Sequence, residues 1–329
     1  MGKALVTGGA GFVGSAVVRQ LREKGRSVRV LLEPGASRRG IDGLDVEVAE
    51  GSVLDRRAMD RALEQCDVLY HLAAIYKLWM PDATKLWDVN VEGTTNVMLA
   101  ARRAGVRRIV HTSSTVTVGL SEDDRPSTEA AAFNHFDLAA DYILSKYVSE
   151  RCVLRFVEDG MPIVIVNPGL PFGERDYAPT PTGKLMLTIL RREVPVLGPG
   201  GFSAIDVDLC ARGHVLAEER GRVGERYVLT DHNITGAEFV RTVGEVAGVA
   251  VPTMYAPAAL GRAVAWAWET WADRVSHREP PATLKALEYA QRNAWFSPDK
   301  ARNELGLGTV PLRETMARAA AFFRAEGMV

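Results

Sequence analysis

The sequence predicts an α/β fold, a doubly wound parallel sheet followed by a smaller C-terminal lobe, and three observations support it. Short β-branched runs alternate with longer helical patterns through the first half of the chain. Several of these runs are apolar at nearly every position, and a glycine-rich segment follows the first run. Continuous apolar runs are typical of parallel strands that helices bury on both faces. Strand–helix alternation at these lengths builds a doubly wound sheet.

The elements follow one another in a regular order. The β-branched runs predict six strands, over residues 3–7, 27–32, 45–49, 68–72, 108–113 and 163–167. Helical spacing predicts helices over residues 12–24, 56–64, 88–104 and 139–159. Helices of this length suit the crossovers between parallel strands.

The glycine-rich segment at residues 7–14 has the spacing Gly-x-x-Gly-x-x-Gly between a strand and a helix. Gly8 permits the tight turn, Gly11 lets the backbone approach a pyrophosphate, and Gly14 lets the helix pack close to the sheet. The phosphates then lie at the positive end of the helix dipole. In this context the pattern is typical of a Rossmann-type dinucleotide site.

The sequence pattern changes after Asn167, where prolines cluster and the strand–helix rhythm ends. We therefore assign residues 1–167 to a dinucleotide-binding domain and residues 168–329 mainly to a smaller substrate-binding lobe. Segments between about residues 204 and 230 are expected to rejoin the first domain.

The composition favours small-molecule chemistry. The chain carries 40 basic and 41 acidic residues, so it has no long-range attraction to nucleic acid. Its cysteines and histidines lack metal-ligand spacing, so we expect no metal site, and a reducing cytoplasm. No signal peptide is expected. Residues 257–273 hold three tryptophans but are too short and too charged to span a bilayer. A buried helix is expected there, with a peripheral membrane contact left open.

A tyrosine and a lysine stand four residues apart in the predicted helix 139–159. Tyr142 and Lys146 therefore share one helix face. A neighbouring ammonium favours the phenolate, so Lys146 is expected to lower the pKa of Tyr142 and make it a general acid or base. Lys146 is also expected to hold the cofactor ribose.

Ser114 lies at the end of the fifth predicted strand. Ligands of open α/β sheets bind at the carboxyl ends of strands. A hydroxyl group there can polarise a substrate carbonyl beside Tyr142. Taken alone, the same serine would equally suit a cap for the following turn.

Together these features resemble the extended short-chain dehydrogenase/reductase superfamily along essentially the whole chain. Three further segments fit it: residues 71–74 after the fourth strand, residues 90–94 in a helix, and residues 167–169 after the sixth strand. The resemblance implies a catalytic set of Ser114, Tyr142 and Lys146, supported by Asn90.

A closer resemblance is to the hopanoid-associated sugar epimerase family, itself similar to dihydroflavonol-4-reductases. It rests on residues 76–82 (YKLWMPD), 180–183 (TPTG), 219–227 and 296–301. It implies an NAD(P)-dependent enzyme of hopanoid or related lipid metabolism that acts on a secondary alcohol or ketone.

The cofactor is expected to be NAD, with NADP left open. Glu33 ends the second strand, where a carboxylate can accept hydrogen bonds from the adenosine ribose and would repel a 2′-phosphate. Arg38 could reach back to such a phosphate, and Ser52 replaces the aspartate usual in relatives. The expected cofactor contacts are Gly8, Gly11, Phe12, Val13, Gly14, Glu33, Arg38, Ser52, Val53, Leu72, Ala73, Ala74, Tyr142, Lys146, Asn167 and Pro168.

The substrate class stays open between a nucleotide sugar, a lipid-linked sugar and a flat polycyclic alcohol. The expected substrate contacts are Tyr76, Trp79, Ser114, Asn167 and Phe202. A diphosphate would need cations, for which the candidates are Arg175, Lys184, Arg191 and Arg192.

Two kinds of reaction remain open, an epimerase that returns the hydride to the same carbon and a reductase or dehydrogenase. A non-catalytic dinucleotide sensor is disfavoured, since it has no use for the serine, tyrosine and lysine set. A homodimer is expected through the helices at 88–104 and 139–159.

Overall fold

The computed structural model describes residues 2–193, 199–250 and 258–329. Its main sheet has seven strands, all parallel, in the order β3-β2-β1-β4-β5-β6-β9. The strands are β1 (Lys3–Thr7), β2 (Val28–Leu32), β3 (Glu47–Glu50), β4 (Cys66–His71), β5 (Arg108–Thr112), β6 (Ile163–Pro168) and β9 (Arg226–Leu229). The predicted doubly wound sheet is confirmed, with strand ends that differ by one or two residues.

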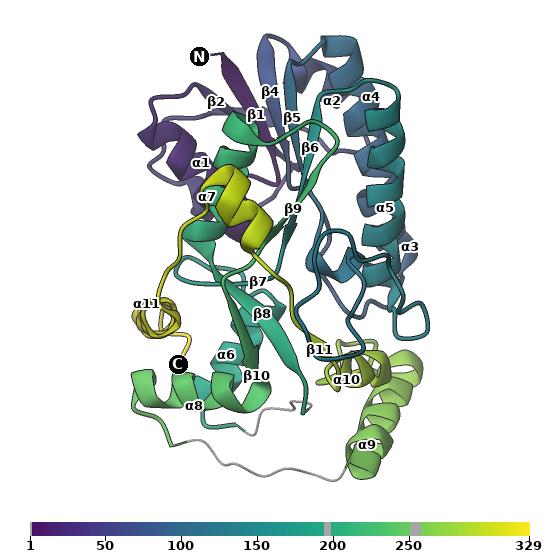
Figure 1. Cartoon of the computed structure of the whole chain (residues 1–329), viewed down its shortest axis with the longest axis vertical. Helices are drawn as coiled ribbons and strands as arrows, with labels where there is room; N and C mark the ends of the chain where they lie inside the picture. The colour runs from purple at the N-terminus through teal and green to yellow at the C-terminus, as the bar shows by residue number, and fades with distance from the viewer. Residues whose placement is uncertain (1, 194–198, 251–257) are drawn as a thin grey trace.

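Helices cover both faces of this sheet (Figure 1). The helices α1 (Phe12–Glu23) and α7 (Val207–Arg220) cover one face, and α2 (Arg56–Leu63), α4 (Thr94–Ala104) and α5 (Asp141–Glu158) cover the other. Alternate strand residues face opposite layers: Ala4 and Val6 pack with α1 and α7, whereas Leu5 packs with the second layer. This two-sided burial explains why the strands are apolar at nearly every position.

The predicted helix 88–104 is not uniform. A wide, π-helical turn at Asp88–Gly93 follows the short helix α3 (Thr84–Trp87) and leads into α4. Asn90 lies in this turn and is 1% exposed. Such wide turns often occur beside functional sites.

A second, smaller sheet lies below the first in Figure 1. It consists of β7 (Leu170–Phe172), β8 (Gly201–Asp206), β10 (His232–Thr235) and β11 (Asn293–Ala294). The helices α6 (Pro181–Leu190), α8 (Gly236–Ala247) and α11 (Leu312–Ala325) pack on it around Phe172, Phe239 and Phe323. Residues 205–206 end β8 in this sheet, whereas α7 and β9 lie with the main sheet.

The tryptophan segment forms α9 (Ala258–Trp271), next to α10 (Leu284–Tyr289). The expectation of a buried helix is wrong for its tryptophans, because Trp266 and Trp271 are 63% and 61% exposed. The helix contacts α10, and its buried side chains include Ala265, which is 1% exposed. Among the described residues, no helix is long and apolar enough to cross a membrane.

The strand order places a ligand crevice at one edge of the main sheet. The chain winds outwards from β1 in one direction through β2 and β3, and in the other from β4 through β6. The loops after β1 and β4 therefore diverge to opposite faces at the carboxyl edge, which is where open α/β sheets bind ligands.

Candidate active site

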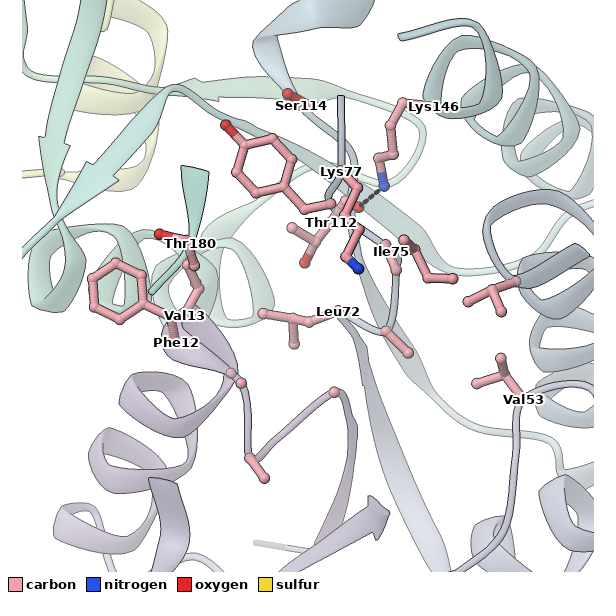
Figure 2. A pocket seen from close by; sticks show the side chains of 18 of the residues that line it. Phe12, Val13, Val53, Leu72, Ile75, Lys77, Thr112, Ser114, Lys146 and Thr180 are labelled. Carbon is pink, nitrogen blue, oxygen red and sulfur yellow. Dashed lines mark hydrogen bonds between the residues drawn. The ribbon is translucent and has the colours of Figure 1, made fainter. Parts of the chain in front are cut away.

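A cavity of about 740 Å³ opens at this carboxyl edge. Figure 2 shows Phe12 and Val13, from the start of α1, across the pocket from Lys146. Fifteen predicted site residues line it: Gly8, Gly11, Phe12, Val13, Gly14, Glu33, Val53, Leu72, Ala73, Ala74, Tyr76, Ser114, Tyr142, Lys146 and Pro168. The structure thus brings together segments that lie more than 150 residues apart in the sequence.

The three glycines of the loop have different surroundings. Gly8 has a φ of +71°, and a Cβ there would lie 2.8 Å from the Ala73 nitrogen. A Cβ on Gly14 would lie 2.1 Å from the Gly8 carbonyl oxygen. A Cβ on Gly11 would meet only that same oxygen, at 3.2 Å. The chain's own packing therefore requires glycine at 8 and 14 but much less at 11.

The start of α1 suits an anionic ligand. Gly11 is its N-cap and offers no side-chain cap, and the first turn has no acidic residue. The first backbone N–H groups of a helix lack intrahelical acceptors and favour a phosphate. With an open approach at Gly11, this cradle fits the pyrophosphate of a dinucleotide.

The second and third strands end in a polar pair beside the cavity. The Ser52 hydroxyl donates to Glu33 Oε1 at 2.9 Å, and Glu33 lines the cavity, although Ser52 does not. Arg38 does not line the cavity. Its side chain forms no ion pair or hydrogen bond in the described part of the chain. Arg39 is directed away, to Glu326 at 2.5 Å and over the Tyr177 ring.

This arrangement predicts a preference for NAD over NADP. A 2′-phosphate about 4 Å from the Glu33 carboxylate would cost about 1–4 kcal/mol, which corresponds to about a 5- to 1,000-fold weaker affinity. Calorimetric titration of the protein with NAD and with NADP gives the ratio of the two dissociation constants. Glu33→Arg should reverse it, and Arg39→Gln is the control because Arg39 is paired elsewhere. Tighter binding of NADP by the unmodified chain would contradict the role of Glu33.

The helix α5 presents Tyr142 and Lys146, which are 8% and 4% exposed. The Lys146 ammonium donates to the Thr112 carbonyl oxygen at 2.9 Å (Figure 2). Burial lowers the pKa of Lys146 to about 8, against an opposing effect of Glu150. Burial raises the pKa of Tyr142 to about 12, and the Ser114 hydroxyl partly offsets this rise.

The expectation that Lys146 lowers the pKa of Tyr142 is therefore wrong for this structure, in which the pKa of Tyr142 is raised. Desolvation of the buried phenol is the larger effect, and the Lys146 ammonium is directed at a carbonyl. The phenol is therefore protonated well above neutral pH, and the structure gives no activation of its ionised form. Tyr142 also packs against Tyr76, with ring centroids 4.9 Å apart.

Ser114 links β5 to a short helical turn at Thr115–Thr117. Its hydroxyl caps this turn by accepting from Val116 N at 3.3 Å, and it also lines the cavity. The Ser114 side chain therefore caps the turn and lines the cavity at the same time.

Two predicted site asparagines lie outside the cavity wall. Asn90 accepts from Ile75 N at 2.7 Å and donates to Ser145 Oγ at 3.0 Å, so it ties the loop after β4 to α5. Asn167 is fully buried, and its amide donates to the Ser114 carbonyl oxygen at 3.1 Å. The Asn167 side chain thus supports the Ser114 backbone and does not line the cavity.

Two predicted substrate aromatics also lie elsewhere. Trp79 lines a separate cavity of about 310 Å³ and donates from Nε1 to Asp273 at 2.9 Å. Phe202 packs between Phe172 and Phe239 in the core of the second sheet. Phe202 is in an apolar core and Trp79 faces charged side chains, and the sequence alone does not separate either environment from a substrate contact.

Several cavity residues were not predicted. They include Ile75, Lys77, Met80, Lys85, Thr112, Leu170 and Thr180. Lys77, Met80 and Thr180 belong to the segments 76–82 and 180–183 that carried the closer resemblance. Those segments were therefore the available signal for this part of the wall.

Residues 4–229 match the profile of the NAD dependent epimerase/dehydratase family. The chain belongs to this family. It is accordingly an NAD-dependent enzyme of the extended short-chain dehydrogenase/reductase group, as the sequence predicted.

Known relatives extend over nearly the whole chain. A putative dihydroflavonol 4-reductase of Synechocystis sp. is 33% identical over 98% of this chain and 95% of its own. Sterol demethylase protein B of Methylococcus capsulatus is 33% identical over 99% of both. A 3 beta-hydroxysteroid dehydrogenase/Delta 5-->4-isomerase of Mycobacterium tuberculosis is 32% identical over 93% of this chain and 86% of its own.

Solved structures show the same fold. The crystal structure of gox2253 has a TM-score of 0.88 and 40% identity, and the match covers 98% of both chains. PA4631, a nucleoside-diphosphate-sugar epimerase from Pseudomonas aeruginosa, has a TM-score of 0.83 and 26% identity over 99% of this chain and 98% of its own.

Proposed function

We propose that this enzyme interconverts a secondary alcohol and a ketone on an apolar, polycyclic skeleton, with Ser114, Tyr142 and Lys146 as its catalytic residues. The observation that carries the proposal is the placement of the cations a nucleotide sugar would need. Arg175, Lys184, Arg191 and Arg192 do not line the cavity of the described structure. Three of them have other partners: Glu174, Glu279 and the Met328 carbonyl oxygen.

The part of the wall near Tyr142 is instead largely apolar. Ile75, Tyr76, Met80 and Val116 pack in one apolar cluster with Tyr142 and line the cavity, which Leu170 and Pro171 also line. Such a surface stabilises an apolar skeleton by burying it, at roughly 25 cal/mol per Å². A few polar groups then orient the reacting carbon, which is the role we give to Ser114 and Tyr142. The relatives named for a sterol and for hydroxysteroids agree with this substrate class.

The cofactor-binding residues and the catalytic residues have separate roles in the proposed reaction. The glycine loop, Glu33 and Leu72–Ala74 would hold NAD, which supplies the hydride exchange when bound. Tyr142, whose phenol is protonated at neutral pH, can donate its proton to a ketone oxygen. The Ser114 hydroxyl orients and polarises that oxygen. The Lys146 ammonium stabilises the phenolate that remains.

Epimerisation of a nucleotide sugar is the second candidate, and two lysines favour it. Lys77 and Lys85 line the cavity, and neither ammonium has an ion pair within the described ranges. They could face a substrate diphosphate. In that reaction the hydride returns to the same carbon, so the cofactor need not leave.

A panel of substrates distinguishes the two candidate activities. Purified enzyme with NAD is offered 3-hydroxysteroids and hopanoid-type alcohols in one arm and UDP- or dTDP-sugars in the other. Absorbance of the reduced nicotinamide reports oxidation, and proton NMR reports the sugar stereoisomers. We expect reduced nicotinamide to accumulate with the polycyclic alcohols only. Conversion of a sugar to its epimer without turnover of the alcohols would overturn the proposal.

Two further expectations from the sequence remain proposals. We propose that the protein acts in the cytoplasm and forms a homodimer through α4 and α5. Both helices cover the same face of the main sheet (Figure 1). Light scattering over a range of concentrations tests the dimer, and a constant monomer mass would exclude it.

A further inference from the structure

Glu150 is a buried carboxylate next to the catalytic residues. It is 2% exposed and lies on α5, one helical turn after Lys146. Thr117 Oγ1 and Asn167 Nδ2 both lie 2.8 Å from its Oε2 atom, and Arg226 Nη1 lies 2.9 Å from Oε1. A charge at this depth persists only where partners satisfy it. These contacts therefore hold the carboxylate in one position.

The same partners lead to Ser114. The Asn167 amide donates to the Ser114 carbonyl oxygen at 3.1 Å, and Thr117 Oγ1 lies 2.8 Å from that oxygen. The two protons of the Asn167 amide thus bridge the Glu150 carboxylate and the Ser114 carbonyl oxygen. The single Thr117 hydroxyl proton serves only one of these two oxygens, while Thr117 N donates to the Ser114 carbonyl oxygen at 3.1 Å. A shift of Glu150 would move the strand end that presents the Ser114 hydroxyl.

Glu150 also acts on Lys146 along its own helix. Its negative charge raises the pKa of Lys146 and opposes the larger effect of burial, which leaves that pKa at about 8. The other titratable groups facing Lys146 are His71 on β4 and His111 on β5. Burial lowers the pKa of both, so they are neutral near pH 7.

Arg226 connects this group to a distant part of the sequence. It begins β9, the strand that joins the main sheet beside β6. Its guanidinium pairs with Glu150 and also donates to the Glu129 carbonyl oxygen. Arg226 thereby neutralises part of the Glu150 charge that Lys146 would otherwise experience.

We propose that Glu150 is a positioning residue, which fixes the Ser114 backbone through Asn167 and Thr117 and supplies the counter-charge for Lys146. The catalytic meaning of this arrangement rests on the proposed function, since Ser114 and Lys146 act there. The arrangement itself can be tested without substrate or dinucleotide.

Two variants should shift the pKa of Lys146 in opposite directions. Glu150→Gln keeps the shape of the side chain but removes the charge, so the pKa of Lys146 should fall below its value of about 8. Arg226→Gln keeps Glu150 and removes its neutralising partner, so the pKa of Lys146 should rise. A loss of packing alone would shift both variants the same way.

The measurement is competitive acylation of Lys146 across pH, quantified by mass spectrometry of the peptide. Circular dichroism on the same samples checks that each variant is folded. An unchanged Lys146 pKa in folded Glu150→Gln, or shifts of one sign in both variants, would overturn the proposal. If Glu150→Gln does not fold, the direction of the shift in Arg226→Gln decides.

Activity adds a second readout. With the polycyclic alcohol, Glu150→Gln should lower kcat by about tenfold or more and leave KM nearly unchanged, and the alkaline limb of its pH–rate profile should shift to lower pH. A lack of activity in the unmodified enzyme would reject the proposed function and leave the acylation result standing. A normal kcat in Glu150→Gln would reject the positioning role alone.

Discussion

Replacement of Tyr142 by phenylalanine is expected to lower kcat by about 10²–10⁴-fold and to leave the dinucleotide Kd almost unchanged. The phenol is the proton donor of the proposed reaction. Tyr142 and Ser114 both line the cavity, so both hydroxyl groups can act on the same substrate oxygen. The dinucleotide contacts are spread over the glycine loop, Glu33 and the loop after β4. Steady-state kinetics and a calorimetric titration measure the two quantities.

Tyr76→Phe is the matched control for this prediction. Tyr76 lines the same cavity, and its ring lies 4.9 Å from that of Tyr142. Removal of its hydroxyl group should change kcat far less, because it has no assigned proton-transfer role. Near-normal kcat in Tyr142→Phe, or an equal loss in both variants, would reject Tyr142 as the acid.

Replacement of Gly11 by valine should abolish dinucleotide binding in a folded protein, with Kd raised by about 100-fold or more. A Cβ at this position meets only the Gly8 carbonyl oxygen, at 3.2 Å. Its φ of −73° and ψ of 174° are allowed for valine. The added methyl groups would occupy the approach of the pyrophosphate to the start of α1. Titration with NAD, together with a melting curve, measures both effects.

Gly14→Val separates binding from folding. A Cβ there would lie 2.1 Å from the Gly8 carbonyl oxygen, so the loop and α1 could not keep their packing. We expect a lower melting temperature for Gly14→Val and little change for Gly11→Val. Unchanged NAD affinity in Gly11→Val would show that the pyrophosphate does not approach this glycine.

The main sheet was predictable because burial on both faces leaves a strong mark on the sequence. Strands β2 and β6 are apolar at most positions, with Arg29 and Asn167 as the exceptions, and the glycine spacing fixes the first crossover. The second sheet has short strands that leave little periodicity. Its β8 strand ends at Asp206, inside the segment expected to rejoin the first domain.

The candidate site was predictable where spacing alone defines geometry, as for Tyr142 and Lys146 on α5. It was less predictable where a residue type suits two environments. Asn167 is as suitable for bracing Ser114 from behind as for contacting a ligand, and Phe202 as suitable for a core as for a substrate wall. The pKa of Tyr142 depends on burial, which a sequence does not give.

The most direct test of the proposed activity follows a deuterium label from the cofactor. The enzyme is given a polycyclic ketone and reduced dinucleotide deuterated at the transferable position of the nicotinamide, and the products are analysed by mass spectrometry and NMR. The account predicts one deuterium on the carbinol carbon of the alcohol product, at a rate that falls with Tyr142→Phe. Bound dinucleotide that keeps its label in the presence of polycyclic ketones would contradict it.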